Sequence, residues 1–212
     1  MVPLMFFTPE TRDRNLLPHD PLKAIVAPRP IGWISTLSKS GTANLAPYSF
    51  FNAVGGMPPI LMFSSEGVKD SARNALETGE FVFNYPGQNL VEEMNASSVP
   101  APSGISEFEY LDIASAESQT VAPPRVAEAH AALECKVTGH VELVDVNGDK
   151  TGAITIFGQV TGVYINDEVI KNGRFDVSIA NPVTRLGYLD FGMTGKMFEM
   201  ERPGFQGQKH NP

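Results

Sequence analysis

The chain has 212 residues, a formal net charge of −8 at pH 7 and 42% hydrophobic residues, which suits a single domain of ordinary composition. The acidic balance argues against nucleic-acid binding, because proteins that hold phosphate backbones depend on lysine and arginine. No apolar run reaches the roughly 18–20 residues of a membrane-spanning helix, so no membrane segment is expected. The first residues lack the basic start and the cleavage site of a signal peptide.

The cysteine and histidine content excludes several kinds of site. One cysteine, Cys135, allows neither an intramolecular disulfide framework nor a multi-thiolate metal site. Its alternating surroundings predict a buried strand residue. A single cysteine without a disulfide framework also indicates a reduced, cytoplasmic setting. No metal site is expected, because the histidines show no metal-ligand spacing. They are His19, His130, His140 and His210.

The first part of the chain is expected to be extended and then strand-rich. Residues 1–20 contain three prolines and predict an extended lead-in. Lys39-Ser40-Gly41 predicts a turn. The run at 60–64 is solidly apolar, which is typical of a strand buried on both faces. The strands expected here are residues 23–28, 30–38, 42–46, 48–54 and 60–64.

The clearest helix is expected over residues 69–78. Asp70 or Ser71 can cap its start, and Gly79 can end it. A strand over 80–85 and a second helix over 88–98 follow.

Residues 99–125 have a different composition, with several prolines and few apolar side chains. We expect a long surface excursion with at most one helical turn, acting as a lid, an interface arm or a mobile segment. Glu107 and Glu109 could face one way on it, but a paired-carboxylate hydrolase would need a pocket around them. The composition predicts that both are exposed, and no hydrolase or nucleotide-binding motif supports that reading.

Longer strands are expected from residue 132. The stretches 132–146 and 153–165 predict a hairpin closed by Asn147-Gly148, and Gly158 predicts a bulge or a close backbone approach. Asn172-Gly173 predicts another turn. Many strands with few short helices indicate a mainly β fold, a closed or partly closed antiparallel barrel.

The stretch SSEGVKDSARN, from Ser64 to Asn74, ends a buried strand and begins a helix. Free N–H groups at a helix start, together with Lys69, Ser71 and Arg73, would form an anion site that suits a phosphomonoester. The alternative is a capped helix with solvated charges.

A second set of residues could hold a flat ring with polar edges, such as the isoalloxazine of a flavin. Short polar groups and aromatic side chains alternate between Arg29 and Asn52. The alternative is that the aromatic residues are core and the hydroxyl groups belong to strand edges. The polar members are Ser35, Thr36, Ser49 and Asn52, and the aromatic members are Trp33, Tyr48, Phe50 and Phe51.

These motifs in this order resemble the flavin reductase-like family of FMN-binding split β-barrel proteins. The likeness runs from RPIGWISTLSKSGTANLAPYSFFNAV through PPILMFSS, KDSARN and ETGEFVFN to LECKV, FGQV and NPVTRLG. It covers about residues 22–190, which would be the core of one domain over residues 1–212, with a tail at 191–212. It implies a Greek-key antiparallel split barrel that forms a homodimer, with FMN near the interface.

The resemblance implies a set of FMN-binding residues, position by position. WIST and YSFFN would line the flavin, and KDS would lie at or near the ribityl phosphate with Arg29 as a helper. Ser64, Asn84 and Arg185 complete the implied set. The full set is Arg29, Trp33, Ser35, Thr36, Tyr48, Ser49, Phe50, Phe51, Asn52, Ser64, Lys69, Asp70, Ser71, Asn84 and Arg185.

The sequence departs from the family at one point. Related nicotinamide-using reductases often carry a Gly-Asp-His run, whereas no histidine lies between Gly148 and Gly158 here.

Three functions follow as hypotheses. The first is an FMN-dependent oxidoreductase with NAD(P)H as a donor, the second an FMN electron carrier reduced by a redox protein partner, and the third a non-catalytic flavin-binding module. No acid–base residue is assigned.

Overall fold

The computed structural model describes residues 5–203; residues 1–4 of the expected lead-in and 204–212 of the expected tail lie outside this range. The α-helices are α1 (Leu22–Ile25), α2 (Asp70–Thr78), α3 (Val91–Ala96), α4 (Glu107–Tyr110) and α5 (Val177–Ala180), and the 3₁₀ turns are η1 (Pro9–Thr11), η2 (Gln88–Leu90) and η3 (Asp167–Val169). Among these, no helix has both the length and the apolar character needed to cross a membrane.

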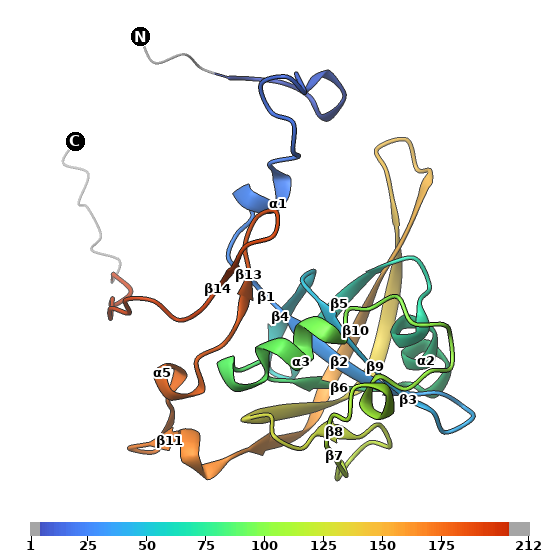
Figure 1. Cartoon of the computed structure of the whole chain (residues 1–212), viewed down its shortest axis with the longest axis vertical. Coiled ribbons are helices and arrows are strands. Elements are labelled where there is room, and N and C mark those ends of the chain that lie inside the picture. Colours follow the sequence, from blue (N-terminus) through green and yellow to red (C-terminus); the bar gives the residue numbers. More distant parts are fainter. Residues whose placement is uncertain (1–4, 204–212) are drawn as a thin grey trace, which may run out of the picture.

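Strands dominate the chain (Figure 1). They are β1 (Arg29–Pro30), β2 (Gly32–Leu37), β3 (Ala43–Tyr48), β4 (Phe51–Gly56), β5 (Pro59–Glu66), β6 (Glu80–Asn84), β7 (Ser115–Ala116), β8 (Arg125–Val126), β9 (Ala131–Val144), β10 (Lys150–Ile165), β11 (Ile170–Lys171), β12 (Arg174–Phe175), β13 (Thr184–Arg185) and β14 (Phe191–Gly192).

Seven strands form one antiparallel sheet in the order β3-β2-β6-β9-β10-β5-β4. The sheet curls until its ends approach each other. The Phe51 ring of β4 lies 2.5 Å from where a Cβ on Gly32 of β2 would be, so only glycine fits there. The Tyr48 ring of β3 lies 5.1 Å from the Phe63 ring of β5. The predicted partly closed antiparallel barrel is confirmed.

Alternation along the strands separates two apolar clusters. Ile34 of β2 faces the barrel interior with Phe63, Phe81 and Cys135. Its neighbour Trp33 faces the other side, where α3 and residues of the excursion cover it. Each large side chain buried in this way contributes roughly 1.5–3 kcal/mol. Burial also raises the pKa of the Cys135 thiol to about 12, so this cysteine is the buried residue that the sequence predicts.

The β9–β10 hairpin is the longest element, and its tip stands clear of the barrel (Figure 1). Gly148, in the predicted Asn147-Gly148 turn, has a φ of +88°, and Asn172-Gly173 turns with φ values of +53° and +72°. Both predicted turns are confirmed. The N-terminal segment with α1 rises on the same side of the barrel as the hairpin tip.

Three local expectations are wrong. The segment 23–28 begins within the helix α1 instead of a strand, because the Asp20 carboxylate accepts the Leu22 N–H at 2.9 Å and starts a turn. β5 alternates between buried and partly exposed residues, so it is not buried on both faces. Neither Asp70 nor Ser71 caps α2, whose N-cap position is Lys69 with no side-chain cap.

The excursion at 99–125 lies on the surface only in part. α4 places Phe108 in the cluster around Trp33, and Glu107 is only 6% exposed. Glu109 is exposed, because residues two apart on a helix point to opposite sides. The expectations that Glu107 is exposed, and that the two carboxylates face one way, are therefore wrong.

Candidate functional site

Three adjoining cavities follow the edge strand β3, and we call them together the β3 groove. Their volumes are about 290, 440 and 210 Å³. The first and second share Asn44, Asp70, Arg73 and Ser103 as lining residues, and the second and third share Pro47 and Ser98. Along the first and second cavities, α2 forms one wall and residues within 97–105 form the other. The shared lining residues make the three cavities continuous, which suits an elongated ligand.

The start of α2 faces the second cavity with unused hydrogen-bond donors. The first intrahelical bond runs from the Arg73 N–H to the Lys69 carbonyl at 2.8 Å, and no described residue accepts the N–H groups of the first turn before it. The exposed Lys69 lines the same cavity and forms no ion pair within residues 5–203. A helix start with an adjacent free cation favours an anion.

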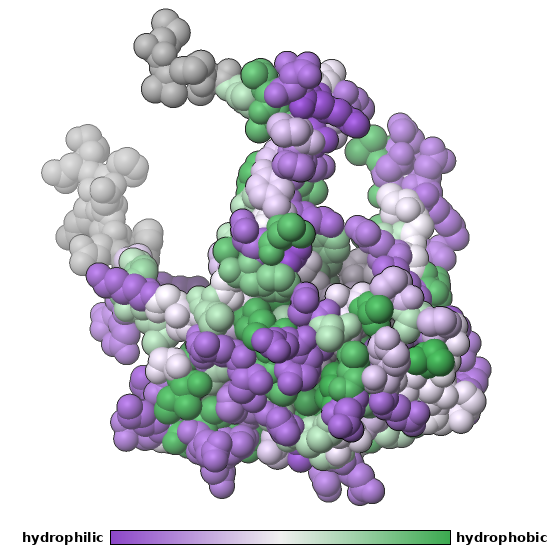
Figure 2. All heavy atoms as spheres, viewed as in Figure 1, coloured by the Kyte–Doolittle hydropathy of each residue, from purple (hydrophilic) through white to green (hydrophobic). Residues whose placement is uncertain are grey.

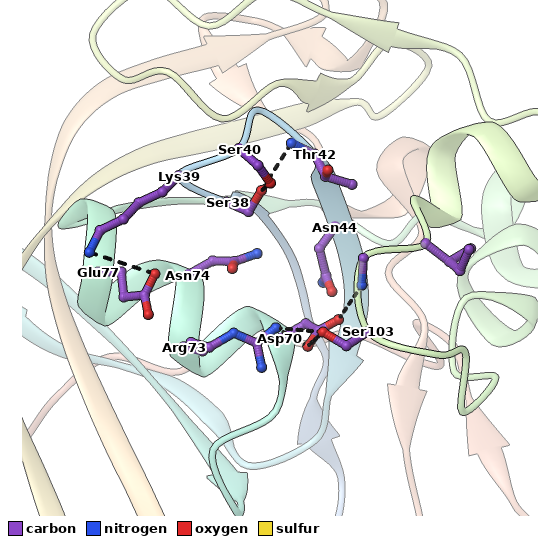
Figure 3. A pocket seen from close by; sticks show the side chains of 12 residues that line it. Ser38, Lys39, Ser40, Thr42, Asn44, Asp70, Arg73, Asn74, Glu77 and Ser103 are labelled. Atoms are coloured by element: carbon purple, nitrogen blue, oxygen red, sulfur yellow. Dashed lines mark hydrogen bonds and ion pairs between the residues drawn. The ribbon is translucent and has the colours of Figure 1, made fainter.

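Asp70 and Arg73 separate the first cavity from the second. The Asp70 carboxylate pairs with the Arg73 guanidinium and accepts the Ser103 hydroxyl at 3.0 Å, as Figure 3 shows. Gly104 also donates its N–H to Asp70 at 3.4 Å. These bonds attach the 97–105 wall to α2, so Asp70 holds the wall of the groove.

The floor of the second cavity is polar. Asn44 donates to the Ser71 hydroxyl at 2.9 Å, and both residues line the cavity with Tyr48. Burial raises the pKa of the Tyr48 hydroxyl, and the neighbouring Ser71 and Ser65 hydroxyls partly offset that rise. Tyr48 therefore stays neutral and offers a hydroxyl donor at the floor.

Glu107 brings a carboxylate to the same cavity from the excursion. One of its oxygens accepts the Leu45 N–H of β3 at 2.8 Å, and the residue lines the cavity. Burial raises the pKa of Glu107, the Leu45 N–H opposes the rise, and the nearby Asp70 carboxylate adds to it. This second wall attachment also satisfies a backbone donor on the open edge of β3.

The structure brings together six of the predicted site residues in the groove. Tyr48, Lys69, Asp70 and Ser71 line the second cavity, and Ser49 and Arg185 line the third. The two groups lie at neighbouring places along β3, because the two cavities share Pro47 and Ser98.

A second predicted group lies outside the groove. Asn84 donates to the Trp33 carbonyl and the Ser35 hydroxyl at 3.1 Å each, and accepts the Val126 N–H at 2.7 Å. Ser35 donates to the Pro124 carbonyl at 2.6 Å. Because Trp33, Ser35 and Asn84 are fully buried, their polar groups fasten the end of the excursion to the barrel and do not line the groove.

The other predicted residues lie outside the groove. Thr36 is buried and accepts from Asn74 at 3.2 Å, and Phe51 stacks on Phe83 in the barrel core at 4.8 Å. Phe50 lies 5.5 Å from the Lys23 amine. Phe50, Asn52 and Ser64 are absent from the lining of all three cavities.

Arg29 is buried beside the third cavity but is engaged with the backbone. Its guanidinium donates to the carbonyls of Lys23, Val26 and Leu186, the last two at 2.6 and 2.9 Å. It therefore lies at the β1–β13 corner, away from the α2 start where a phosphate helper was expected.

Sequence reasoning missed several groove residues. Asn44 belongs to the quoted ANLAPYSFF motif, so alternation along β3 could have found it. The others come from the helix end and the excursion, where no motif points to a ligand. The missed residues are Asn44, Ser97, Ser98, Ser103 and Glu107.

Comparison with known proteins places this geometry in a family. A family model described as "Flavin reductase like domain" matches residues 26–184. An uncharacterized protein of Halalkalibacterium halodurans is 36% identical over 183 residues, which cover 84% of this chain and 87% of that protein.

Two solved structures have a similar fold. Nitrilotriacetate monooxygenase component B from Bacillus cereus has a TM-score of 0.86 at 26% identity, covering 94% of this chain and all (100%) of that chain. Flavoredoxin of Desulfovibrio vulgaris (Miyazaki F) has a TM-score of 0.73 at 17% identity, covering 82% of this chain and 91% of that chain. The protein therefore belongs to the flavin reductase like domain family, and its antiparallel barrel is a split barrel.

Proposed function

We propose that this protein binds FMN along the β3 groove and acts as an FMN-dependent oxidoreductase. The observation that carries the proposal is the uncapped start of α2 with the free Lys69 amine, at one end of a groove that continues along β3. A phosphate would lie at that start, and the ring would extend over Pro47 toward the third cavity.

The residues present suit such a ligand. FMN pairs a dianionic phosphate with a polyhydroxylated chain and a flat ring with polar edges. The α2 start supplies positive charge and N–H donors, and the floor supplies the amide of Asn44 and the hydroxyls of Tyr48 and Ser71. Bound flavin supplies the electron-transfer chemistry. The chain itself binds and orients it, with the 97–105 wall held in place by Asp70.

The test compares FMN with riboflavin, which lacks the phosphate. Lys69→Ala is expected to weaken FMN by roughly tenfold to a hundredfold, because a hydrogen bond to a charged group contributes about 1.5–3 kcal/mol. Riboflavin affinity should change by less than about threefold. Fluorescence quenching of each flavin measures both dissociation constants.

Lys171→Ala is the matched control, since Lys171 is an exposed lysine on β11, outside the groove. A protein that takes up no flavin contradicts the proposed function. Equal losses for FMN and riboflavin on Lys69→Ala would instead contradict the phosphate position at α2.

The electron donor forms a second part of the proposal. NAD(P)H is one candidate donor, and a redox protein partner is the other. The absence of histidine between Gly148 and Gly158 favours the protein partner, in an electron-carrier role. Anaerobic mixing of the flavin-loaded protein with NADH and NADPH separates the two donors.

A reduced, cytoplasmic setting is also proposed, because the single cysteine is buried and unpaired.

A homodimer with FMN near the interface completes the proposal. Large apolar side chains are exposed on the N-terminal segment and on the tip of the β9–β10 hairpin, including Phe6, Ile25 and Val146. Figure 2 shows apolar side chains among polar ones on both projections. A second copy is the partner that would bury them.

A further inference from the structure

The third cavity of the β3 groove combines one cation with an apolar floor. Ile31 and Met94, both buried, form part of the floor, and Phe191 adds an aromatic ring. Ser49, Asn95 and Ser98 supply short polar groups, and Arg185 supplies the single charge. The second cavity differs in its charges, because both acidic and basic side chains line it.

The positive charge at this cavity is uncompensated. Arg185 and Arg29 are cross-strand partners in β13 and β1. No carboxylate within residues 5–203 forms an ion pair with either of them. Burial, followed by the charge of Arg185, lowers the pKa of Arg29. In a chain of net charge −8, two adjacent arginines without an acidic partner form a local site of positive potential.

Arg185 also has donors to spare. One terminal nitrogen donates to the Tyr188 carbonyl at 2.5 Å, and the guanidinium carbon lies 4.3 Å from the centre of the Phe191 ring. The remaining N–H groups have no acceptor among the described residues, although a guanidinium carries five. Packing on Phe191 fixes the plane of the guanidinium group. Its N–H donors form a planar fork, which suits a planar anion with two oxygens.

We propose that the third cavity is a binding site for a small, flat organic monoanion, an aromatic carboxylate in chemical class. Its carboxylate lies on the free face of the Arg185 fork, and its ring lies on Ile31, Met94 and Phe191. Ser49, Asn95 and Ser98 surround the ring with short polar groups that can bind its substituents. A phosphate fits this cavity less well, because three charged oxygens would press against the apolar floor.

The position of this anion site relative to the flavin can also be inferred, and that inference rests on the proposed function. With the phosphate at the α2 start, the ring end of FMN points toward Pro47 and Ser98, which the second and third cavities share. The carboxylate ligand then lies next to the ring, where an electron acceptor or an effector of the flavin would bind.

The test uses benzoate and benzamide, which have the same shape and differ in charge. Calorimetric titration of the flavin-loaded protein is expected to show benzoate binding at least about tenfold more tightly than benzamide, since an arginine–carboxylate bond is charge-assisted. Arg185→Gln should remove this preference, and Arg185→Lys, which keeps the charge but loses the fork, should retain part of it. Arg174→Gln, at an exposed arginine of β12, should leave it unchanged.

Several results would overturn the proposal. Equal affinities for benzoate and benzamide exclude an anion site, and inorganic phosphate that binds as tightly as benzoate excludes the assigned ligand class. A fall in the FMN-to-riboflavin affinity ratio on Arg185→Gln would assign the arginine to the flavin phosphate instead. If the protein takes up no flavin, the same titration of the flavin-free chain still decides the anion site, while the proposed function alone fails.

Discussion

Glu107 is a carboxylate that the fold holds out of water at the edge of a cavity. Its pKa is raised by burial first and by the Asp70 charge in addition. A folded-state pKa above the unfolded value means that the folded protein binds the proton more tightly. The stabilisation is then present below the unfolded pKa and is lost as pH rises through the folded value.

We therefore expect Glu107→Gln to gain stability over the wild type as pH rises from about 4 to about 8. The glutamine carbonyl can still accept the Leu45 N–H, so the wall attachment remains. Thermal unfolding of both proteins across this range measures the difference. Glu109→Gln, at the exposed neighbour, should show no such trend, and a pH-independent gain in Glu107→Gln would contradict the account.

Ser35 of the WIST motif and Asn84 of the FVFN motif have partners in the structure that the sequence does not indicate. Ser35 and Asn84 look like ligand-binding groups because buried strands rarely carry polar side chains. In the structure their partners are the Trp33 and Pro124 carbonyls and the Val126 N–H. Two of these partners belong to the segment at 124–126: Val126 lies 42 residues from Asn84, and Pro124 lies 89 residues from Ser35. No local pattern could therefore reveal them.

Among the elements, the β9–β10 hairpin contains a glycine with no room for a side chain. An added Cβ at Gly158 would lie 2.3 Å from the Phe81 ring, and a register shift falls between Phe157 and Gly158. The predicted close approach is confirmed.

Gly158→Ala is expected to lower the free energy of unfolding by about 1–3 kcal/mol, the usual cost of overpacking a core. Urea denaturation measures the change. Gly139→Ala is the matched control, because Gly139 lies on the neighbouring strand β9 with no atom within 4 Å of an added Cβ. If both variants lose the same stability, the cause is strand propensity and not the Phe81 contact.

Elements with local signals could be predicted from the sequence, and elements set by distant partners could not. α2, ended by Gly79 in the left-handed conformation, and the two Asn-Gly turns follow local rules. α1 and the buried part of the excursion do not. Phe108 is buried because it packs beside α3 on the face of β2 that carries Trp33, whereas composition alone suggests exposure.

At the scale of the whole molecule, two projections rise from the barrel on one side (Figure 1). Phe6, Ile25 and Val146 on them, and Leu189 beside them, are at least 75% exposed. Single exposed apolar residues are ordinary, but this grouping favours an interface.

We expect a homodimer, with about twice the chain mass of 23.0 kDa in light scattering after gel filtration. Ile25→Glu combined with Leu189→Glu should shift the protein toward the monomer, because buried unpaired charges oppose association. Val163→Glu, at an exposed apolar residue of β10, should leave the mass unchanged. A wild-type protein that is monomeric at all concentrations would contradict the dimer.

Because the groove runs along β3, a strand at the edge of the sheet, the groove residues also affect self-association. An open edge of a sheet invites strand addition by another chain, which is a common route to aggregation. On β3 the Leu45 N–H is already bonded to Glu107, and Pro47 has no N–H to offer. Neighbouring chains therefore find few free donors at this edge, although it stays accessible to a small ligand. Glu107 and Pro47, which both line the groove, therefore also oppose polymerisation through the β3 edge.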